Sequence, residues 1–199
     1  VKLGVKKIRI TGGEPLLHPE ILPICQAVAR IPGLQELCLT TNGKLLPALA
    51  KPLKEAGVSR LNISLDTLRP DRFAAITRLG RLEDVLSGIR AAEGAGFDHL
   101  KLNAVLMGGI NDDEIGDFLA LTREHPWQVR FIELMPMGPC GTWPRERFLP
   151  VTEVLARFPD LEPLPPEGVA RQYRLPGALG TVGLIAPLSH SFCSQCRRI

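Results

Sequence analysis

The stretch Arg9-Ile10-Thr11-Gly12-Gly13-Glu14-Pro15 is typical of a short strand that runs directly into a turn. Two adjacent glycines let the backbone bend sharply and approach a ligand closely. Glu14 can accept a hydrogen bond from a ligand amine, and Pro15 stiffens the exit from the turn. A strand end that needs glycine only to turn explains the same string equally well. The rest of the chain therefore has to decide between a plain turn and a binding site.

Strand-like runs rich in apolar and β-branched residues alternate with amphipathic stretches along the first two thirds of the chain. We expect strands at 6–11, 35–40, 60–66, 99–107 and 128–135. Helices are expected around 21–28 and over 45–56, 82–95 and 112–124. Repeated strand-helix units predict a parallel sheet with right-handed crossovers, which is either open or closed into a barrel.

One face of the expected strands carries polar residues, and the opposite face is mostly apolar. Because alternate strand residues share a face, the polar set is Lys7, Arg9, Thr11, Cys38, Thr40, Asn42, Asn62, Ser64, Asp66, Lys101, Asn103 and Arg130. Burying unpaired cations costs several kcal/mol each, so this face needs water or a ligand. A single lysine such as Lys7 or Lys101 could equally extend to solvent at a strand mouth. The pattern favours an α/β fold, an incomplete (β/α) TIM-type barrel whose interior binds a ligand.

The character of the chain changes after Met135. We expect a loop at 136–141, a short helix at 151–158 and a proline-rich connector at 161–167. Segments 172–175 and 180–185 predict a small hairpin or barrel-flanking β extension. We therefore expect a barrel core at 1–138 and a C-terminal extension at 139–199.

Composition narrows the class of protein. The 199 residues carry a net charge of +3, 45% hydrophobic residues and 5% aromatic residues. No basic block with interleaved aromatics is present, so a nucleic-acid surface is not expected. No apolar run approaches the roughly 20 residues that span a bilayer. A cytoplasmic protein is expected, and the abrupt start at Val1 and end at Ile199 suggest a piece of a longer chain.

Cys193-Ser194-Gln195-Cys196 could hold two thiolates on one metal. The bare spacing suits a zinc knuckle or a redox pair as well as an iron-sulfur site, although no second such pair completes a zinc site. Cys25 and Cys38 lie in helix and strand patterns and are expected to be inert core residues, while Cys140 in a loop is unassigned. The four histidines have no ligand spacing and are expected to be structural or exposed: His18, His99, His125 and His190.

The Gly-Gly-Glu-Pro turn resembles the S-adenosylmethionine (SAM) motif of the radical SAM superfamily. More closely, five motifs in order resemble the molybdenum cofactor biosynthesis protein A family, a family of GTP 3',8-cyclases. The motifs lie at 4–16, 39–43, 62–66, 130–135 and 191–196. Together they cover nearly the whole chain and are far more specific than any one of them.

The resemblance implies roles for individual residues. The implied SAM contacts are Gly13, Ser64 and Met135, with Gly12 and Glu14 adjoining. The implied GTP contacts are Arg9, Thr40, Lys101 and Arg198, with Lys7 and Arg130 as further phosphate partners. Cys193 and Cys196 are implied to hold a second 4Fe-4S cluster together with a third cysteine further on, its open iron binding the purine.

The implied reaction is the first step of molybdopterin synthesis. A 5'-deoxyadenosyl radical made from SAM removes a hydrogen from the GTP ribose, and C3' then attacks C8. The product is (8S)-3',8-cyclo-7,8-dihydroguanosine 5'-triphosphate. The CxxxCxxC motif that holds the SAM-cleaving 4Fe-4S cluster is absent from this sequence, as are the third cysteine and the Gly-Gly tail. This stretch alone is therefore expected to be inactive.

The implied partners are GTP, an electron donor and the next enzyme of the molybdopterin pathway, and a homodimer stays open. Two other functions are compatible with parts of the pattern. One is a radical SAM peptide maturase with an auxiliary cluster, although a peptide needs no cradle of cations for a triphosphate. The other is a zinc-stapled barrel without catalytic activity.

Overall fold

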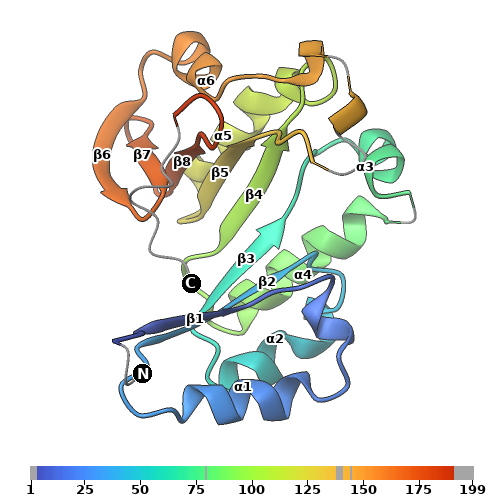
Figure 1. The fold of residues 1–199 in the computed structure, drawn as a ribbon, viewed down its shortest axis with the longest axis vertical. Helices are drawn as coiled ribbons and strands as arrows, with labels where there is room; N and C mark the ends of the chain where they lie inside the picture. The colour runs from blue at the N-terminus through green and yellow to red at the C-terminus, as the bar shows by residue number, and fades with distance from the viewer. Residues whose placement is uncertain (1–3, 79, 138–140, 144, 191–199) are drawn as a thin grey trace. The chain divides into compact units, whose positions relative to one another are not determined.

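The computed structural model of this chain describes residues 4–78, 80–137, 141–143 and 145–190. The chain forms two compact units. One comprises residues 1–65 and 73–101, and the other comprises residues 66–72 and 102–199. We call them the N-terminal and C-terminal units (Figure 1). The boundary expected near residue 138 stays a prediction.

Three parallel strands form the sheet of the N-terminal unit: β1 (Lys7–Ile10), β2 (Glu36–Thr41) and β3 (Arg60–Ser64). The register places Arg9 opposite Cys38, and Thr40 opposite Asn62. Directly paired residues share a face of a sheet, so the expected polar face is built here. The three strands lie within one or two residues of their expected bounds.

Helices cover the apolar side of these strands. They are α1 (Ile21–Ala29), α2 (Leu46–Glu55) and α4 (Leu82–Gly94). In Figure 1, α1 and α2 lie on the same side of β1 and β2. The side chains of Leu37, Leu39, Leu61 and Ile63 are buried, as the alternation predicts. Gly88 lets α4 approach the turn after β2, because a Cβ there would lie 2.1 Å from the Gly43 carbonyl oxygen.

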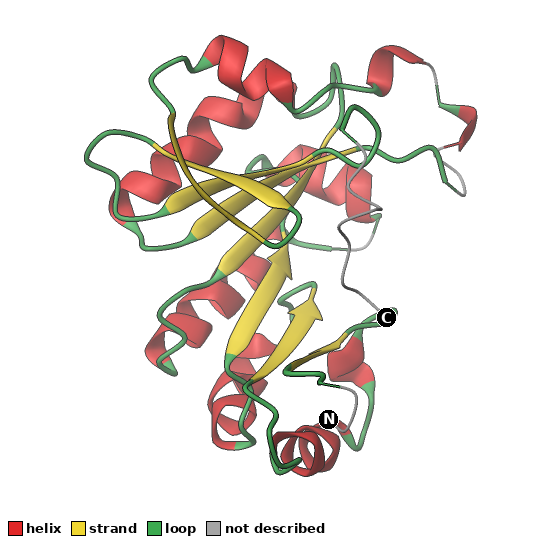
Figure 2. Ribbon diagram, turned by 60° about the vertical axis from the view of Figure 1, so that its left-hand side comes forward, coloured by secondary structure: helices red, strands yellow, loops and turns green. Residues whose placement is uncertain are grey.

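The sheet of the C-terminal unit runs in the order β4-β5-β8-β7-β6. Its strands are β4 (Lys101–Leu106), β5 (Gln128–Glu133), β6 (Glu162–Glu167), β7 (Ala170–Arg174) and β8 (Thr181–Ile185). β8 pairs parallel to β5, whereas β7 pairs antiparallel to both β8 and β6. The expected hairpin therefore exists, and its second strand also extends the parallel sheet. Figure 2 shows these strands with the helices of the unit.

The expectation for one segment is wrong, and one α-helix was not expected. The proline-rich segment expected to be a connector is strand β6, which among the described strands pairs with β7 alone and lies at the edge of the sheet. Proline is tolerated on edge strands because no neighbour needs its missing N–H. Helix α3 (Pro70–Thr77) was not expected, since its apolar stripe is short.

The helices of the C-terminal unit are α5 (Ile115–Glu124) and the short α6 (Thr152–Arg157), both close to their expected positions. Phe118 of α5 meets Phe131 of β5 edge to face, with ring centroids 5.9 Å apart. Glu114, just before α5, is fully buried and accepts hydrogen bonds from Thr67 Oγ1 (2.6 Å) and the Leu68 N–H (2.6 Å). This carboxylate ties the segment after β3 to the start of α5. Among the described residues, no helix is long and apolar enough to cross a membrane.

Candidate functional site

The Gly12-Gly13-Glu14 turn follows β1 directly and leads into the 3-10 turn Pro15–Leu17. Gly12 adopts a φ of 150°, which side chains rarely tolerate. A Cβ built on Gly12 or Gly13 would meet no atom within 4 Å among the described residues. The turn thus presents bare backbone to open space, and a ligand can approach it closely.

Glu14 anchors this turn to the end of β2. Its carboxylate accepts hydrogen bonds from Thr41 Oγ1 (2.7 Å), the Asn42 N–H (2.7 Å) and the Leu16 N–H (3.0 Å). An ionised carboxylate can accept about four hydrogen bonds, so capacity for a ligand amine remains. The sequence indicated Glu14 as a ligand contact but did not reveal this anchoring role. Thr41 and Asn42 could have been suspected only from the TTNG motif at the strand end.

Lys7 and Arg9 share one face of β1, and their surroundings differ. Lys7 Nζ lies 2.6 Å from Glu36 Oε2, and Arg60 Nη2 lies 3.0 Å from Glu36 Oε1. Lys7 is exposed, whereas Arg9 is half-buried further along the strand. Glu36 therefore already compensates the charge of Lys7 at the beginning of the polar face. Sequence reasoning missed both Glu36 and Arg60, because neither belongs to a motif.

The middle of the polar face holds buried polar groups. Thr40 is half-buried and lies opposite Asn62, which is only 1% exposed. Asn62 Nδ2 has no hydrogen-bond partner among the described residues. Buried polar groups are normally satisfied, so an orphaned donor here indicates a face arranged for a polar ligand. Ser64 is exposed at the end of β3, and Lys101, the first residue of β4, is 5% exposed.

Asp66 lies just after β3 in the polar set. Burial raises the pKa of Asp66, and a hydrogen bond from the Val105 N–H (2.9 Å) offsets part of that rise. The Asn111 amide donates to the Asp66 carbonyl oxygen (2.6 Å) and to the Val105 carbonyl oxygen (2.8 Å). These hydrogen bonds connect the segment after β3 to β4. They give Asp66 a structural role in the C-terminal unit.

Arg130 and Met135 belong to the C-terminal unit. Arg130 is 6% exposed on β5, and its Nε–H donates to Gln128 Oε1 at 2.5 Å. Met135, two residues past the end of β5, is 39% exposed. A thioether that stays partly open to solvent beyond a strand end can contact a ligand there.

Glu133, at the end of β5, is buried and saturated with donors. It accepts hydrogen bonds from the N–H groups of Val151 (3.3 Å), Leu188 (3.0 Å) and Ser189 (3.0 Å), and a short one from Ser189 Oγ. Burial by itself would raise the pKa of Glu133, but these hydrogen bonds outweigh burial and lower it. Glu133 thus fixes the segment that precedes the two C-terminal cysteines, a role the sequence did not reveal.

Three expected site residues, Cys193, Cys196 and Arg198, lie outside the described part of the chain, as does the unassigned Cys140. Among the described residues, no group of three or more His, Cys, Asp or Glu side chains could hold a metal ion. Cys25 and Cys38 are buried free thiols, as expected, and burial raises the pKa of Cys25. Of the histidines, His125 stacks on Trp127 at 3.8 Å, and His18 Nδ1 accepts from the Glu20 N–H.

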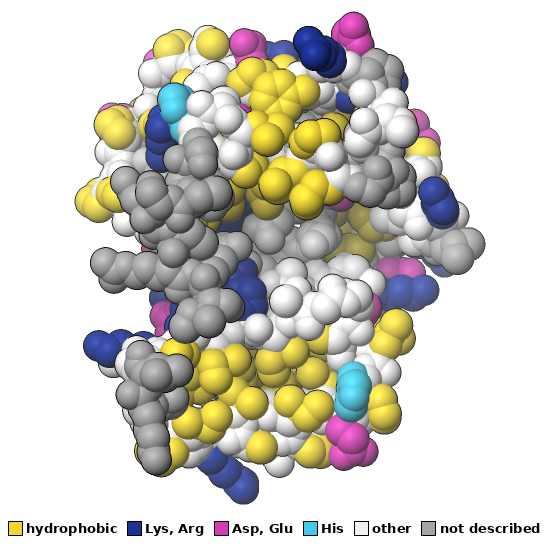
Figure 3. Space-filling model, viewed as in Figure 1, with side chains coloured by type: hydrophobic (Ala, Val, Ile, Leu, Met, Phe, Trp, Pro, Cys, Tyr) yellow, Lys and Arg dark blue, Asp and Glu magenta, His cyan; other side chains and the backbone are white. Residues whose placement is uncertain are grey.

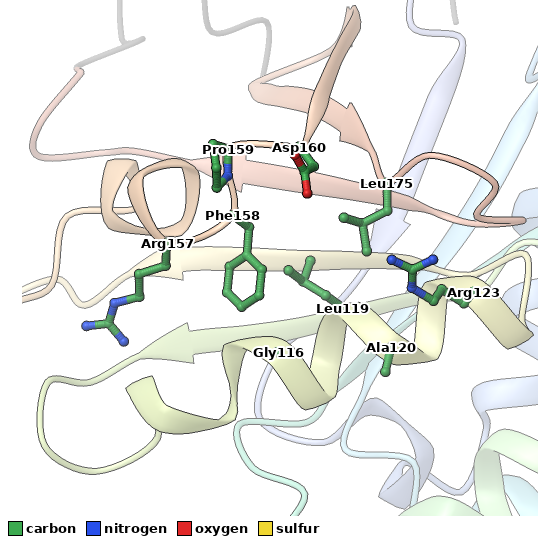
Figure 4. Close-up of a pocket in the computed structure, with 9 residues that line it drawn as sticks. All are labelled: Gly116, Leu119, Ala120, Arg123, Arg157, Phe158, Pro159, Asp160 and Leu175. Atoms are coloured by element: carbon green, nitrogen blue, oxygen red, sulfur yellow. The ribbon is translucent and has the colours of Figure 1, made fainter.

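A surface cavity of about 200 Å³ in the C-terminal unit contains none of the expected site residues. It lies between α5 and the segment after α6, where the Phe158 ring packs over Gly116 (Figure 4). Its Arg157 is bound to the Asp112 carbonyl oxygen at 2.8 Å. In the face shown in Figure 3, the described Lys and Arg side chains are dispersed among other types. Neither this cavity nor the cations on that face form a better candidate site than the polar strand face.

Comparison with known proteins gives matches along the whole chain. Residues 1–122 match the radical SAM superfamily, and residues 127–199 match Molybdenum Cofactor Synthesis C. GTP 3',8-cyclases of Alkaliphilus oremlandii and Peptoclostridium acidaminophilum are 48% and 50% identical to it over 100% of this chain. The GTP 3',8-cyclase of Geobacter sulfurreducens is 49% identical over the same share. The chain spans 62–63% of the length of these relatives.

A solved structure of TYW1 with a lysine-pyruvate adduct bound has a similar fold. The TM-score is 0.53 at 19% identity, and the match covers 81% of this chain and 53% of that one. At this identity the likeness concerns the fold alone, an α/β fold with a parallel sheet and antiparallel C-terminal strands. The family match extends over most of the strand-helix region that carries the Gly-Gly-Glu turn and the polar face. The chain belongs to the radical SAM superfamily.

Proposed function

We propose that this chain is the central and C-terminal part of a GTP 3',8-cyclase that acts in molybdenum cofactor biosynthesis. The observation that carries the proposal is the identity of 48–50% along 100% of the chain to GTP 3',8-cyclases of three bacteria. The matched region covers both the turn and the polar strand face.

The turn after β1 suits SAM. Gly12 and Gly13 present backbone to open space, and Glu14 retains capacity to accept from an amine while it holds the turn. Ser64 is exposed at the end of β3, where a hydroxyl can bind a ribose. Met135, which is 39% exposed, is the further SAM contact that the family resemblance implies. These groups would bind and orient SAM, which supplies the organic radical when a 4Fe-4S cluster cleaves it reductively.

The cations of the polar face suit a triphosphate. Arg9 is half-buried and Lys101 and Arg130 are buried, so their charges act in surroundings that strengthen charge-assisted hydrogen bonds to phosphate. Lys7 would have to share its charge between Glu36 and a phosphate. Thr40 and the orphaned Asn62 donor add neutral polar groups to the sheet face that carries Arg9.

The remaining parts of the proposal concern residues outside the described structure. Cys193 and Cys196 would each ligate one iron of a second 4Fe-4S cluster through a thiolate, and Arg198 would contact GTP. The electron donor, the next enzyme of the molybdopterin pathway and a cytoplasmic location stay predictions. So does the inactivity of this stretch by itself, since its sequence lacks a CxxxCxxC motif.

The test uses the full-length protein, purified and reconstituted without oxygen. The proposal expects it to bind GTP and, with SAM and a reductant, to form the 3',8-cyclised nucleotide. Failure of the reconstituted wild-type protein to bind GTP would overturn the proposal.

The site is tested by Arg9→Ala and Lys101→Ala. Each should weaken GTP binding by about 1.5–3 kcal/mol, the usual worth of a hydrogen bond to a charged group. Arg90→Ala, on the exposed side of α4, is the matched control and should leave GTP affinity unchanged. A loss of thermal stability with retained GTP affinity would assign Arg9 and Lys101 to the fold instead.

A further inference from the structure

A chain of side-chain hydrogen bonds crosses the C-terminal sheet from β6 to β5. Gln172 Nε2 donates to Glu167 Oε2 at 3.1 Å, and Gln128 Nε2 donates to Gln172 Oε1 at 3.1 Å. Gln128 Nε2 also donates to Thr181 Oγ1 at 3.2 Å. Gln128 Oε1 in turn accepts from Arg130 Nε at 2.5 Å. No motif in the sequence marked these glutamines.

The charged residues at the two ends of this series of hydrogen bonds fix which group donates and which accepts at every step. A carboxylate only accepts hydrogen bonds and a guanidinium only donates them. Glu167 therefore fixes the Gln172 amide with its nitrogen toward β6 and its oxygen toward Gln128. The Gln128 amide is fixed in the same sense, with its oxygen toward Arg130. The orientation of both amides follows from the charged ends and needs no further assumption.

The backbone of β8 leaves room for this arrangement. Gly183 lies directly opposite Arg130 on β8 and opposite Gln172 on β7. A Cβ on Gly183 would lie 3.1 Å from Arg130 Cγ, closer than about nine in ten real Cβ contacts. The absence of a side chain at position 183 therefore lets the stem of Arg130 pass close to the β8 backbone.

We propose that Gln128, supported by Gln172 and Gly183, is a positioning residue that aims the Arg130 guanidinium at the phosphates of the substrate. The inference rests on the proposed function, in which Arg130 is a phosphate partner. Gln128 accepts the Nε–H of Arg130. Because the guanidinium is rigid and planar, fixing Nε also fixes the direction of the two terminal Nη groups.

The choice of an amide at position 128 has a chemical reason. A carboxylate there would form a charged hydrogen bond with Arg130 and would compete with phosphate for its charge. A neutral amide oxygen orients the guanidinium and adds no negative charge beside it. Because Gln128 is 7% exposed, solvent does not screen this difference.

The experiment measures binding of GTP and of guanosine to the full-length protein and its variants by calorimetry. Gln128→Met removes the acceptor at similar length, and Gln128→Glu places a carboxylate beside Arg130. Both variants should bind GTP about tenfold or more weakly, and guanosine as tightly as wild type does. Gln26→Glu, exposed on α1, adds the same charge as Gln128→Glu and should change neither affinity.

A second arm uses Arg130→Ala. If Gln128 acts through Arg130, Gln128→Met should cause no further loss of GTP affinity in the Arg130→Ala background. Unchanged GTP affinity in both Gln128 variants would overturn the inference, and so would equal losses for GTP and guanosine. Either result would leave the proposed function standing, because that function is judged by GTP binding and conversion in the wild-type protein.

Discussion

Glu14, in the turn after β1 of the N-terminal unit, and Glu133, at the end of β5 in the C-terminal unit, are both carboxylates that bind backbone N–H groups of another segment. Glu133 is 1% exposed and accepts from Val151, Leu188 and Ser189. Glu14 is half-buried and ties its turn to β2 through Thr41 and Asn42. One carboxylate is enclosed by the fold, whereas the other holds a turn whose glycines face open space.

The contrast teaches that a polar residue at a strand end in this fold has two uses, and that burial separates them. A carboxylate enclosed with several donors stabilises the loops around it. A carboxylate with the same number of lone pairs at an open turn can serve a ligand as well. The first kind should matter for folding, and the second should matter mainly for binding.

The largest expected effect is on Glu133. Glu133→Gln keeps the shape of the side chain but turns an NH₂ group toward N–H donors. It should therefore lower the free energy of unfolding by about 3 kcal/mol. Urea unfolding of the full-length protein without its clusters measures this loss. Glu124→Gln, exposed at the end of α5, is the control and should change it by no more than about 0.5 kcal/mol. If the two variants were equally stable, Glu133 would not stabilise the fold and would not differ from Glu14 in this respect.

The turn beside Glu14 should respond in the opposite way. Gly13→Val meets no atom within 4 Å of its Cβ, so the free energy of unfolding should fall by less than about 1 kcal/mol. SAM affinity should fall by about 100-fold or more, because the added side chain occupies the space that the ligand needs (roughly 2.7 kcal/mol). Calorimetry with SAM and a melting curve measure the two quantities. Gly94→Val, also in open space at the end of α4, controls for the added bulk.

Much of the fold follows from the sequence because its signals are local. The apolar alternation of β2 and β3 predicted strands whose inner residues, Leu39 and Ile63, are fully buried. The prolines of β6 misled because edge pairing is a property of the neighbouring strand, which the segment itself does not encode. Short α3 was missed for a related reason, since few of its residues are buried.

The candidate site was predictable only in part. Motif residues such as Gly13 and Arg9 could be proposed because the family motif marks their positions. Glu36, Gln128 and Glu133 could not, because their roles depend on which side chain lies across a strand or loop from them. Those partners are far away in the sequence, and a lone glutamate or glutamine carries no pattern that reveals them.

Acid should lower the free energy of unfolding of the wild type more than that of Glu133→Gln, because it protonates the Glu133 carboxylate. The folded-state pKa of Glu133 is lowered below its usual 4.5, so its contribution is fully present above that value and is lost as pH falls through the folded-state pKa. The difference in unfolding free energy between wild type and Glu133→Gln should therefore be largest near pH 7 and should narrow below about pH 4. Unfolding curves at several pH values measure it. A difference that stayed constant with pH would mean that charge at Glu133 does not matter.

The smallest effect is expected at Asn62, on the polar face of the N-terminal unit. Its buried Nδ2 lacks a partner among the described residues, in contrast to the saturated carboxylate of Glu133. Replacing an unsatisfied amide by an apolar group of similar shape removes a desolvation penalty. Asn62→Leu should therefore leave the free energy of unfolding of the ligand-free protein unchanged or raise it by up to about 1 kcal/mol. Thr122→Val is the contrasting control, because Thr122 is buried and its hydroxyl donates to the Leu119 carbonyl oxygen at 2.7 Å. A clear loss of stability in Asn62→Leu would mean that this amide supports the fold as Glu133 does, and the distinction between the two units would then fail at this position.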